Sequence, residues 1–172
     1  MSNKLTPIII EVTLVNEHIM RQRIHHSLGV ISQVSVYALT EASNLTVKDA
    51  FYATLESVVD QCPRGNTLRV LGDFNASTGT DRDGYETCVG PHGAGTMNQN
   101  NTKFLDFAIS HGFRVAGSWF QHPQGHRWTW DSNAGSVAKE IDHVLVDGHW
   151  RKIQNAGSTG VLSSSILTTG LL

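Results

Sequence analysis

The sequence predicts an α/β (α+β) fold, because segments of strand periodicity alternate with segments of helical periodicity along the chain. Residues 8–15, 20–26 and 30–38 have the pattern of strands, and the second shows the period of two expected of a half-buried strand. Residues 46–62 have helical periodicity and precede a short apolar strand at 68–71. The order strand, helix, strand is typical of mixed α/β domains. A chain of 172 residues, 40% hydrophobic and 16% charged, is long enough to form one globular domain.

Segment 46–62 is the clearest helix of the sequence. Thr46 is expected to cap its N-terminus, with Asp49 three residues later in the manner of a capping box. The turn-forming residues 63–66 end it. Its apolar residues recur at helical spacing and predict one buried face, made of Val47, Phe51, Leu55, Val58 and Val59.

The second half of the chain begins with a segment rich in Gly, Asp and Thr. We expect residues 78–96 to form an exposed loop of the kind that often borders active sites. A second helix is predicted at 101–111, followed by strands at 127–131 and 141–146. Asp142 stands at the start of the last strand.

Composition excludes several classes of protein. No apolar segment approaches the length that crosses a membrane, so no membrane association is expected. Cys62 and Cys88 are too few for a disulfide framework, which favours an intracellular location, nuclear or cytoplasmic. The net charge of -2 provides no general basic surface. Binding to nucleic acid would therefore have to use local contacts and a metal ion.

The pentapeptide Gly72-Asp73-Phe74-Asn75-Ala76 is the most informative motif, because it follows an apolar strand. If the strand continues through it, Asp73 and Asn75 lie on the same face. A carboxylate and an amide at one point can order a water, hold a divalent cation and hydrogen-bond a phosphate. The alternative interpretation is a plain turn, since Gly, Asp and Asn all favour turns.

Four motifs in order resemble the endonuclease/exonuclease/phosphatase superfamily: Ser35-Val36-Tyr37-Ala38, the pentapeptide at 72–76, Arg127-Trp128-Thr129-Trp130, and the segment 139–146. That superfamily includes abasic-site endonucleases and the endonuclease domains of LINE retrotransposons, and the likeness is strongest to the craniofacial development protein 2-like group. The resemblance covers roughly residues 16–155, preceded by an unassigned strand within 1–15. It implies a partial sandwich of two mostly antiparallel sheets flanked by helices, with the active site where strand ends converge.

The resemblance also implies roles for individual residues. The catalytic set would be Asp73, which handles the attacking water or the phosphate charge, Asn75, which orients it, and Asp142, which holds a histidine near the end of the domain. Tyr37, Trp130 and Asn98 are the candidate substrate-binding residues. Mg²⁺ or Mn²⁺ is the implied cofactor, with Asp73 as a candidate ligand.

Structural interpretations of the same residues compete with these roles. Tyr37 also fits a half-buried strand tyrosine, and Trp130 a core aromatic residue. Asp142 fits a simple strand-start residue. Asn98, just before the second helix, fits a helix cap better than a phosphate contact.

Two functional residues of the superfamily have no counterpart in this sequence. The family's upstream Glu, its principal metal ligand, is not found before Tyr37, and no histidine follows His149 to complete the closing Asp-His pair. Residues 156–172 carry no charge. Codons TCA-ATA-CTG-ACC-ACC-GGC for residues 165–170 would read Asn-Thr-Asp-His-Arg in a shifted frame. We therefore expect a truncated copy of the domain with a tail produced by a one-base frameshift near Asn155, which the encoding nucleotide sequence tests.

The function expected from the resemblance is divalent-metal-dependent hydrolysis of a phosphodiester, endonuclease-like, and impaired or inactive in this chain. One alternative is a catalytically dead, retroelement-derived fragment that acts only as a binding module. Another is a small-molecule phosphatase of the same fold. Nucleic acid is the expected partner of the phosphodiester hydrolase.

Overall fold

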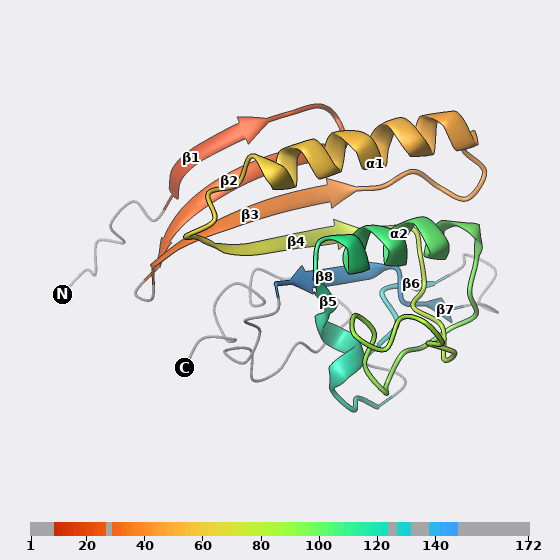
Figure 1. Ribbon diagram of the computed structural model, residues 1–172. Helices are drawn as coiled ribbons and strands as arrows, with labels where there is room; N and C mark the ends of the chain where they lie inside the picture. The colour runs from red at the N-terminus through yellow and green to blue at the C-terminus, as the bar shows by residue number, and fades with distance from the viewer. Residues whose placement is uncertain (1–8, 27–28, 124–126, 132–137, 148–172) are drawn as a thin grey trace.

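A six-stranded mixed sheet forms the centre of the computed structural model, which describes residues 9–26, 29–123, 127–131 and 138–147. The strand order is β1-β2-β3-β4-β8-β5 (Figure 1), and β3 and β4 are parallel while every other neighbouring pair is antiparallel. The strands of this sheet are β1 (Ile9–Leu14), β2 (Ile19–His26), β3 (Gly29–Tyr37), β4 (Thr67–Asp73), β5 (Arg114–Val115) and β8 (Asp142–Val146). A separate two-stranded antiparallel sheet pairs β6 (Trp130–Asp131) with β7 (Ala138–Lys139).

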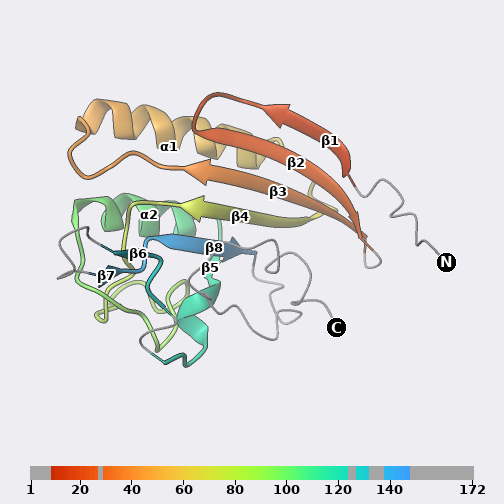
Figure 2. The ribbon, with the colours of Figure 1, turned by 180° about the vertical axis from the view of Figure 1, so that it is seen from behind.

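Helices α1 (Leu45–Asp60) and α2 (Gln99–Ser110) lie on one face of the large sheet, and a short 3₁₀ helix, η1 (Ala116–Trp119), follows β5. Seen from behind, the strands stand in front of both helices (Figure 2). Parallel strands need a crossover connection, and α1 supplies it between β3 and β4. The α/β fold class predicted from the sequence is confirmed.

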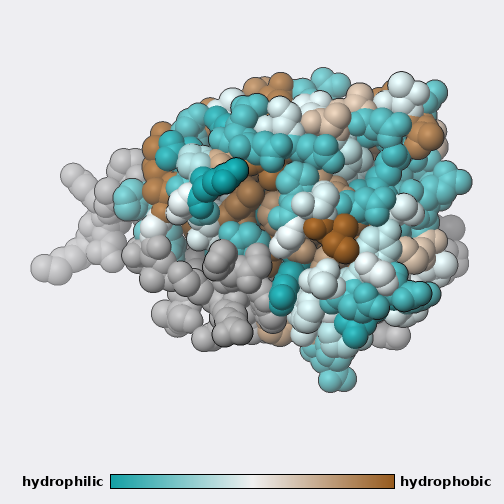
Figure 3. Space-filling view, in the orientation of Figure 1, coloured by the Kyte–Doolittle hydropathy of each residue, from teal (hydrophilic) through white to brown (hydrophobic). Residues whose placement is uncertain are grey.

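The core lies between the helices and the covered face of the sheet. The buried side of α1 is mostly apolar, as predicted, although it also includes Lys48, whereas Val47 is exposed. The outer side of the helices is mostly hydrophilic in the space-filling view (Figure 3). Side chains with at most 1% exposure anchor this layer from both sides, among them Ile19, Val34, Leu55, Val70, Phe104 and Leu145. Their burial supplies the main stabilisation of the sheet.

The predicted cap of α1 is wrong by two residues. Asn44 is the N-cap, and its Oδ1 accepts the backbone N–H of Thr46 at 2.8 Å. Asp49, expected to complete a capping box, instead pairs with Lys103 of α2. Both Asn and Thr are good caps, so the sequence alone did not separate them.

Two further expectations need correction. The segment 78–96 is irregular as predicted but is not simply exposed, because Thr78, Cys88 and Val89 are buried against the core. The strand expected at 127–131 is reduced to the two residues of β6. The tail at 156–172 lies outside the described residues. None of the described helices is long and apolar enough to cross a membrane.

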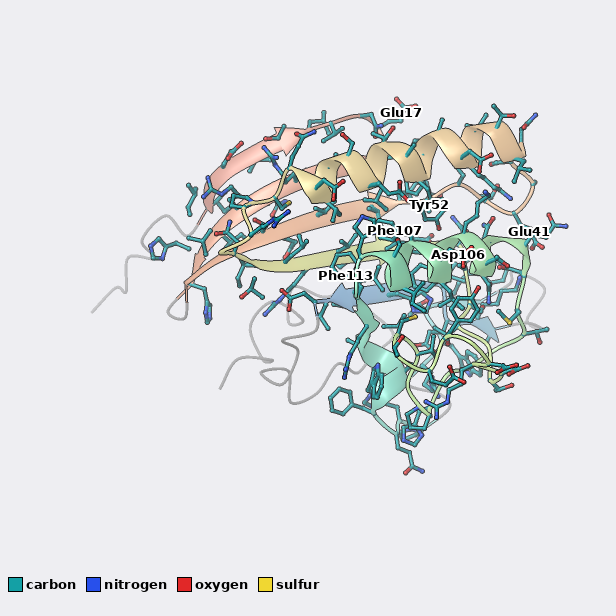
Figure 4. All side chains as sticks on the ribbon, in the orientation of Figure 1. Glu17, Glu41, Tyr52, Asp106, Phe107 and Phe113 are labelled. Atoms are coloured by element: carbon teal, nitrogen blue, oxygen red, sulfur yellow. The ribbon has the colours of Figure 1, made fainter. Side chains whose placement is uncertain are left out.

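Tyr52 lies between the two helices (Figure 4), with its ring 5.9 Å from that of Phe107. Its hydroxyl oxygen is buried and has no hydrogen-bond partner among the described residues. Burial raises the pKa of this phenol well above its usual value. The unpaired hydroxyl therefore costs stability rather than adding to it.

We expect the substitution Tyr52→Phe to raise the free energy of unfolding by up to about 1 kcal/mol, because it removes a buried unpaired hydroxyl at nearly constant volume. Tyr85→Phe is the matched control. The Tyr85 hydroxyl donates to Asp106 at 3.0 Å, so its loss should lower the free energy of unfolding by roughly 0.5 kcal/mol. Urea denaturation with an unchanged m-value measures both. If Tyr52→Phe lowered the free energy of unfolding more than Tyr85→Phe does, the conclusion that the Tyr52 hydroxyl is unpaired would be wrong.

Candidate functional site at the strand ends

Three of the predicted site residues stand in one row across three neighbouring strands. Tyr37 ends β3, Asp73 ends β4, and Asp142 begins β8. In the strand register Asp73 is opposite Tyr37 on one side and opposite Asp142 on the other. These ends lie at the same edge of the sheet in Figure 1. Residues separated by 105 positions in sequence are thus brought together by strand pairing alone.

Gly72 permits this row. Its φ is +140°, and an added Cβ would lie 2.0 Å from the carbonyl oxygen of Val36. Real Cβ atoms do not approach backbone oxygens so closely, so only glycine allows β4 to stay paired with β3 up to Asp73. The glycine of the motif therefore has a defined structural role.

Asn75 is placed by a turn and not by continuation of the strand. β4 ends at Asp73, and Asn75 adopts a left-handed conformation with φ 48°. The Asp73 Oδ1 accepts the backbone N–H of Asn75 at 2.7 Å, which forms an Asx turn. The side-chain amide of Asn75 donates to the carbonyl of Ala38 at 2.8 Å. The expectation that strand alternation sets Asp73 and Asn75 on one face is wrong, although the two residues are joined through this turn.

Phe74 anchors the motif from below. It is fully buried, its ring lies 4.6 Å from that of Phe104, and its N–H donates to the carbonyl of Ile141 at 2.9 Å. The motif is thus fastened to the helix layer by a side chain and to the segment before β8 by its backbone. Asp73 and Asn75 are left partly exposed on either side of it.

His143 lies beneath the site and was not predicted as a functional residue. Its Nε2 donates to the carbonyl of Ala76 at 2.7 Å, and its ring stacks on Phe104 at 4.9 Å. Burial lowers the pKa of this imidazole to about 4, so it is neutral at pH 7. The signal was present in the sequence, because strand alternation turns the residue after Asp142 toward the opposite, buried face.

The start of β8 is held by two further contacts. Thr129 Oγ1 accepts the backbone N–H groups of Ile141 at 3.0 Å and Asp142 at 3.2 Å. Next to them, the nearly buried Arg127 and Glu140 form an ion pair at 3.1 Å. Burial raises the pKa of Glu140, while Arg127 lowers it. Breaking such a pair would leave a buried charge, so the ion pair holds the segment that leads into β8 against Arg127.

Asn98 and Asn100 support the motif from α2. Asn98 occupies the N-cap position of α2, but its Oδ1 has no hydrogen-bond partner among the described residues, and its Nδ2 donates to the carbonyl of Asn75 at 3.2 Å. Asn100 Nδ2 donates to the same carbonyl and to that of Leu39, each at 3.0 Å. Asn100 is almost completely buried. Any contact of Asn98 with substrate stays a prediction.

Trp130 lies on the two-stranded sheet and not at the strand ends of the large one. Its side chain is 44% exposed, so the alternative of a core aromatic residue is wrong. The ammonium of Lys139 lies 5.9 Å from its ring centroid. Tyr37 is likewise more exposed than a half-buried strand tyrosine, at 56%. Their roles in binding substrate stay predictions.

Ionisation of Asp73 is electrostatically unfavourable in the folded protein. Partial burial raises the pKa of its carboxyl, the N–H of Asn75 lowers it, and the carboxylate of Asp142 raises it. A divalent cation beside these two carboxylates would offset the unfavourable effect of Asp142 on the ionisation of Asp73. Mg²⁺ commonly takes one or two protein carboxylates and keeps waters and substrate phosphates as its other ligands. Within the described ranges, no three His, Cys, Asp or Glu side chains gather as a metal site.

The sheet, its covering helices and the row of polar strand ends give this chain an α/β fold that is similar to that of a solved endonuclease domain. Its structure is similar to the endonuclease domain of TRAS1, a telomere-specific non-LTR retrotransposon, with a TM-score of 0.57 and 10% identity over 84% of this chain and 58% of that one. SmcL also matches, with a TM-score of 0.50 and 12% identity over 81% of this chain and 50% of that one. No family model matches the chain.

In sequence, the chain is similar to craniofacial development protein 2 of Tragulus javanicus and of Bos taurus, 24% identical to each over 151 residues. The match covers 88% of this chain but only 26% and 25% of the two relatives. The chain therefore spans about a quarter of the length of the curated relatives it matches. The resemblance predicted from the four motifs is confirmed.

The raised pKa of Asp73 gives a pH-dependent prediction for Asp73→Asn. The folded state holds the proton of Asp73 more tightly than the unfolded state, so its ionisation lowers stability as pH rises through the raised pKa. An asparagine avoids this cost and can still accept the N–H of Asn75. We expect the variant to be more stable than the wild type at pH 7 and equally stable at pH 3, measured by urea denaturation.

Asp81→Asn is the control for that experiment. Asp81 is exposed and also accepts a backbone N–H two residues on, from Asp83 at 3.1 Å. Its substitution should change stability by less than about 0.5 kcal/mol at either pH. A gain in Asp73→Asn that is equal at pH 3 and pH 7 would show that ionisation of Asp73 is not its source.

Proposed function

We propose that this chain is a divalent-metal-dependent phosphodiester hydrolase of the endonuclease type, with its site at the ends of β3, β4 and β8. The observation that supports it most is the row of Tyr37, Asp73 and Asp142 at one sheet edge. The TRAS1 domain, which has a similar fold, is an endonuclease domain. Nucleic acid is the proposed substrate, bound through local contacts.

The chemistry proposed for the site follows from its residues. Asp73 would accept a proton from an attacking water, and its hydrogen bond from the Asn75 N–H supports one orientation of the carboxylate. Tyr37 is exposed beside it, where its hydroxyl can donate to a phosphate oxygen. Asp142 is held by Thr129 and raises the pKa of Asp73 toward the range in which a carboxylate exchanges protons more readily.

A magnesium ion would be held by the carboxylates of Asp73 and Asp142, with waters and a substrate phosphate as remaining ligands. When bound, such an ion stabilises the charge that develops on the phosphoryl oxygens. Two protein ligands make a weak site for Mg²⁺. We therefore propose that the ion binds together with the substrate and that the activity of this chain is low.

Nicking of a supercoiled plasmid in the presence of Mg²⁺ tests the proposal. We expect the wild-type chain to nick the plasmid and EDTA to abolish the reaction. Asp73→Ala should lower the rate by about 10²-fold or more, because it removes both the proton acceptor and a metal ligand. Asp81→Ala, an exposed aspartate outside the row, should leave the rate unchanged.

Equal nicking by the wild type and Asp73→Ala would contradict the proposal. Magnesium-independent plasmid binding without nicking would support the alternative of a non-catalytic binding module. Release of inorganic phosphate from a small phosphomonoester, lost in Asp73→Ala and without plasmid nicking, would favour the small-molecule phosphatase.

A further inference from the structure

His18 lies against Tyr37 at the sheet edge that carries the proposed site. It directly precedes β2, and the glutamate before it, Glu17, is labelled in Figure 4. The imidazole Nδ1 is 2.8 Å from the carbonyl oxygen of Tyr37. The backbone carbonyl of His18 in turn accepts the N–H of Tyr37 at 2.9 Å. Both backbone groups of Tyr37 are thus bonded to one residue.

Ring contacts add to these hydrogen bonds. The rings of His18 and Tyr37 are nearly parallel, with an interplanar angle of 15° and centroids 6.3 Å apart. His18 also meets the buried Phe51 of α1 edge-on, with centroids 6.1 Å apart. His18 is therefore held by the helix layer and transmits that support to an exposed tyrosine.

The His18 backbone is itself fixed. Its N–H donates to Asn16 Oδ1 at 2.9 Å, so the turn before β2 is closed by a side-chain acceptor. The side chain is 27% exposed, and its Nε2 faces Glu17 at 3.9 Å. Glu17 is 85% exposed, and an ion pair in that setting contributes little. The contacts with Tyr37 and Phe51 are the ones that define the ring position.

We propose that His18 is a positioning residue that holds Tyr37 in place for the phosphodiester chemistry at Asp73. This inference rests on the proposed function. A carbonyl oxygen can only accept, so the hydrogen bond requires the proton on Nδ1 and leaves Nε2 unprotonated in the neutral ring. The next residue, Ala38, donates its N–H to the carbonyl of Asp73 at 2.7 Å, so fixing Tyr37 also fixes the backbone beside Asp73.

The first experiment needs no activity. Nitrogen-15 NMR of the 172-residue chain at pH 8 should show His18 in the Nδ1–H tautomer, opposite to the Nε2–H form that free imidazole side chains favour. His25, exposed near the far end of β2, serves as the internal reference. An Nε2–H tautomer at His18 would overturn the proposal whatever the activity of the chain.

The second experiment uses the magnesium-dependent nicking assay and a double-mutant cycle. His18→Phe keeps an aromatic ring but removes the donor, and we expect kcat/KM to fall about tenfold because Tyr37 is no longer fixed. His25→Phe, the same change away from the site, should have no effect. If His18 acts through Tyr37, His18→Phe should cost nothing further in a Tyr37→Ala background.

Additive losses in the double variant would overturn the positioning role. Circular dichroism and urea denaturation of each variant separate loss of fold from loss of position. If the wild type does not nick the plasmid at all, the proposed function fails, and the tautomer of His18 then decides by itself whether this residue holds Tyr37.

Discussion

The parallel pairing of β3 with β4 is the constraint on which the rest of this structure depends. It places Tyr37 beside Asp73, and it requires α1 as the crossover that buries the covered face of the sheet. The pairing continues to the last residue of β4 only because Gly72 has no Cβ to meet the carbonyl of Val36. A single methyl group at position 72 would separate the two strands at the point where the site begins.

The same pairing explains why the ionised form of Asp73 is unfavourable for stability. Asp73 lies between two strands, and its other neighbour in the register is Asp142, so partial burial and a like charge both disfavour its ionisation. Groups that are unfavourable for the fold alone are common at functional sites, where a cation or substrate relieves the cost. The Asx turn through Asn75 offsets part of it by donating a hydrogen bond to the ionised form.

The sequence predicted elements better than it predicted how they meet. Strand alternation and helical spacing identified β1 to β4, β8, both helices and the fold class, because these patterns reflect which side of each element is buried. The two-residue strands β5 and β7 were not predicted. They did not show that Asn75 leaves the strand with φ 48°, since this conformation depends on the carbonyl of Ala38 and on the support of Asn100 from α2. Nor did they show that Val89, in a polar segment, joins the core. The conformation of Asn75 and the burial of Val89 depend on contacts between residues far apart in sequence, which local sequence patterns do not reveal.

The polar groups around the strand ends also share a chemical character. Several of their backbone carbonyls accept hydrogen bonds from side-chain N–H donors that are uncharged at pH 7, most of them asparagine amides. His143 belongs to this set because burial lowers its pKa to about 4. A scaffold of neutral donors keeps its shape whether or not a cation is bound, which leaves Asp73 and Asp142 as the groups in the row that respond to charge. The donors and their acceptors are Asn75 to Ala38, Asn100 to Leu39 and Asn75, Asn98 to Asn75, and His143 to Ala76. The site can therefore be interpreted as two ionisable carboxylates held in a rigid neutral frame, an arrangement that favours electrostatic selection of a cation and a phosphate over a change of shape.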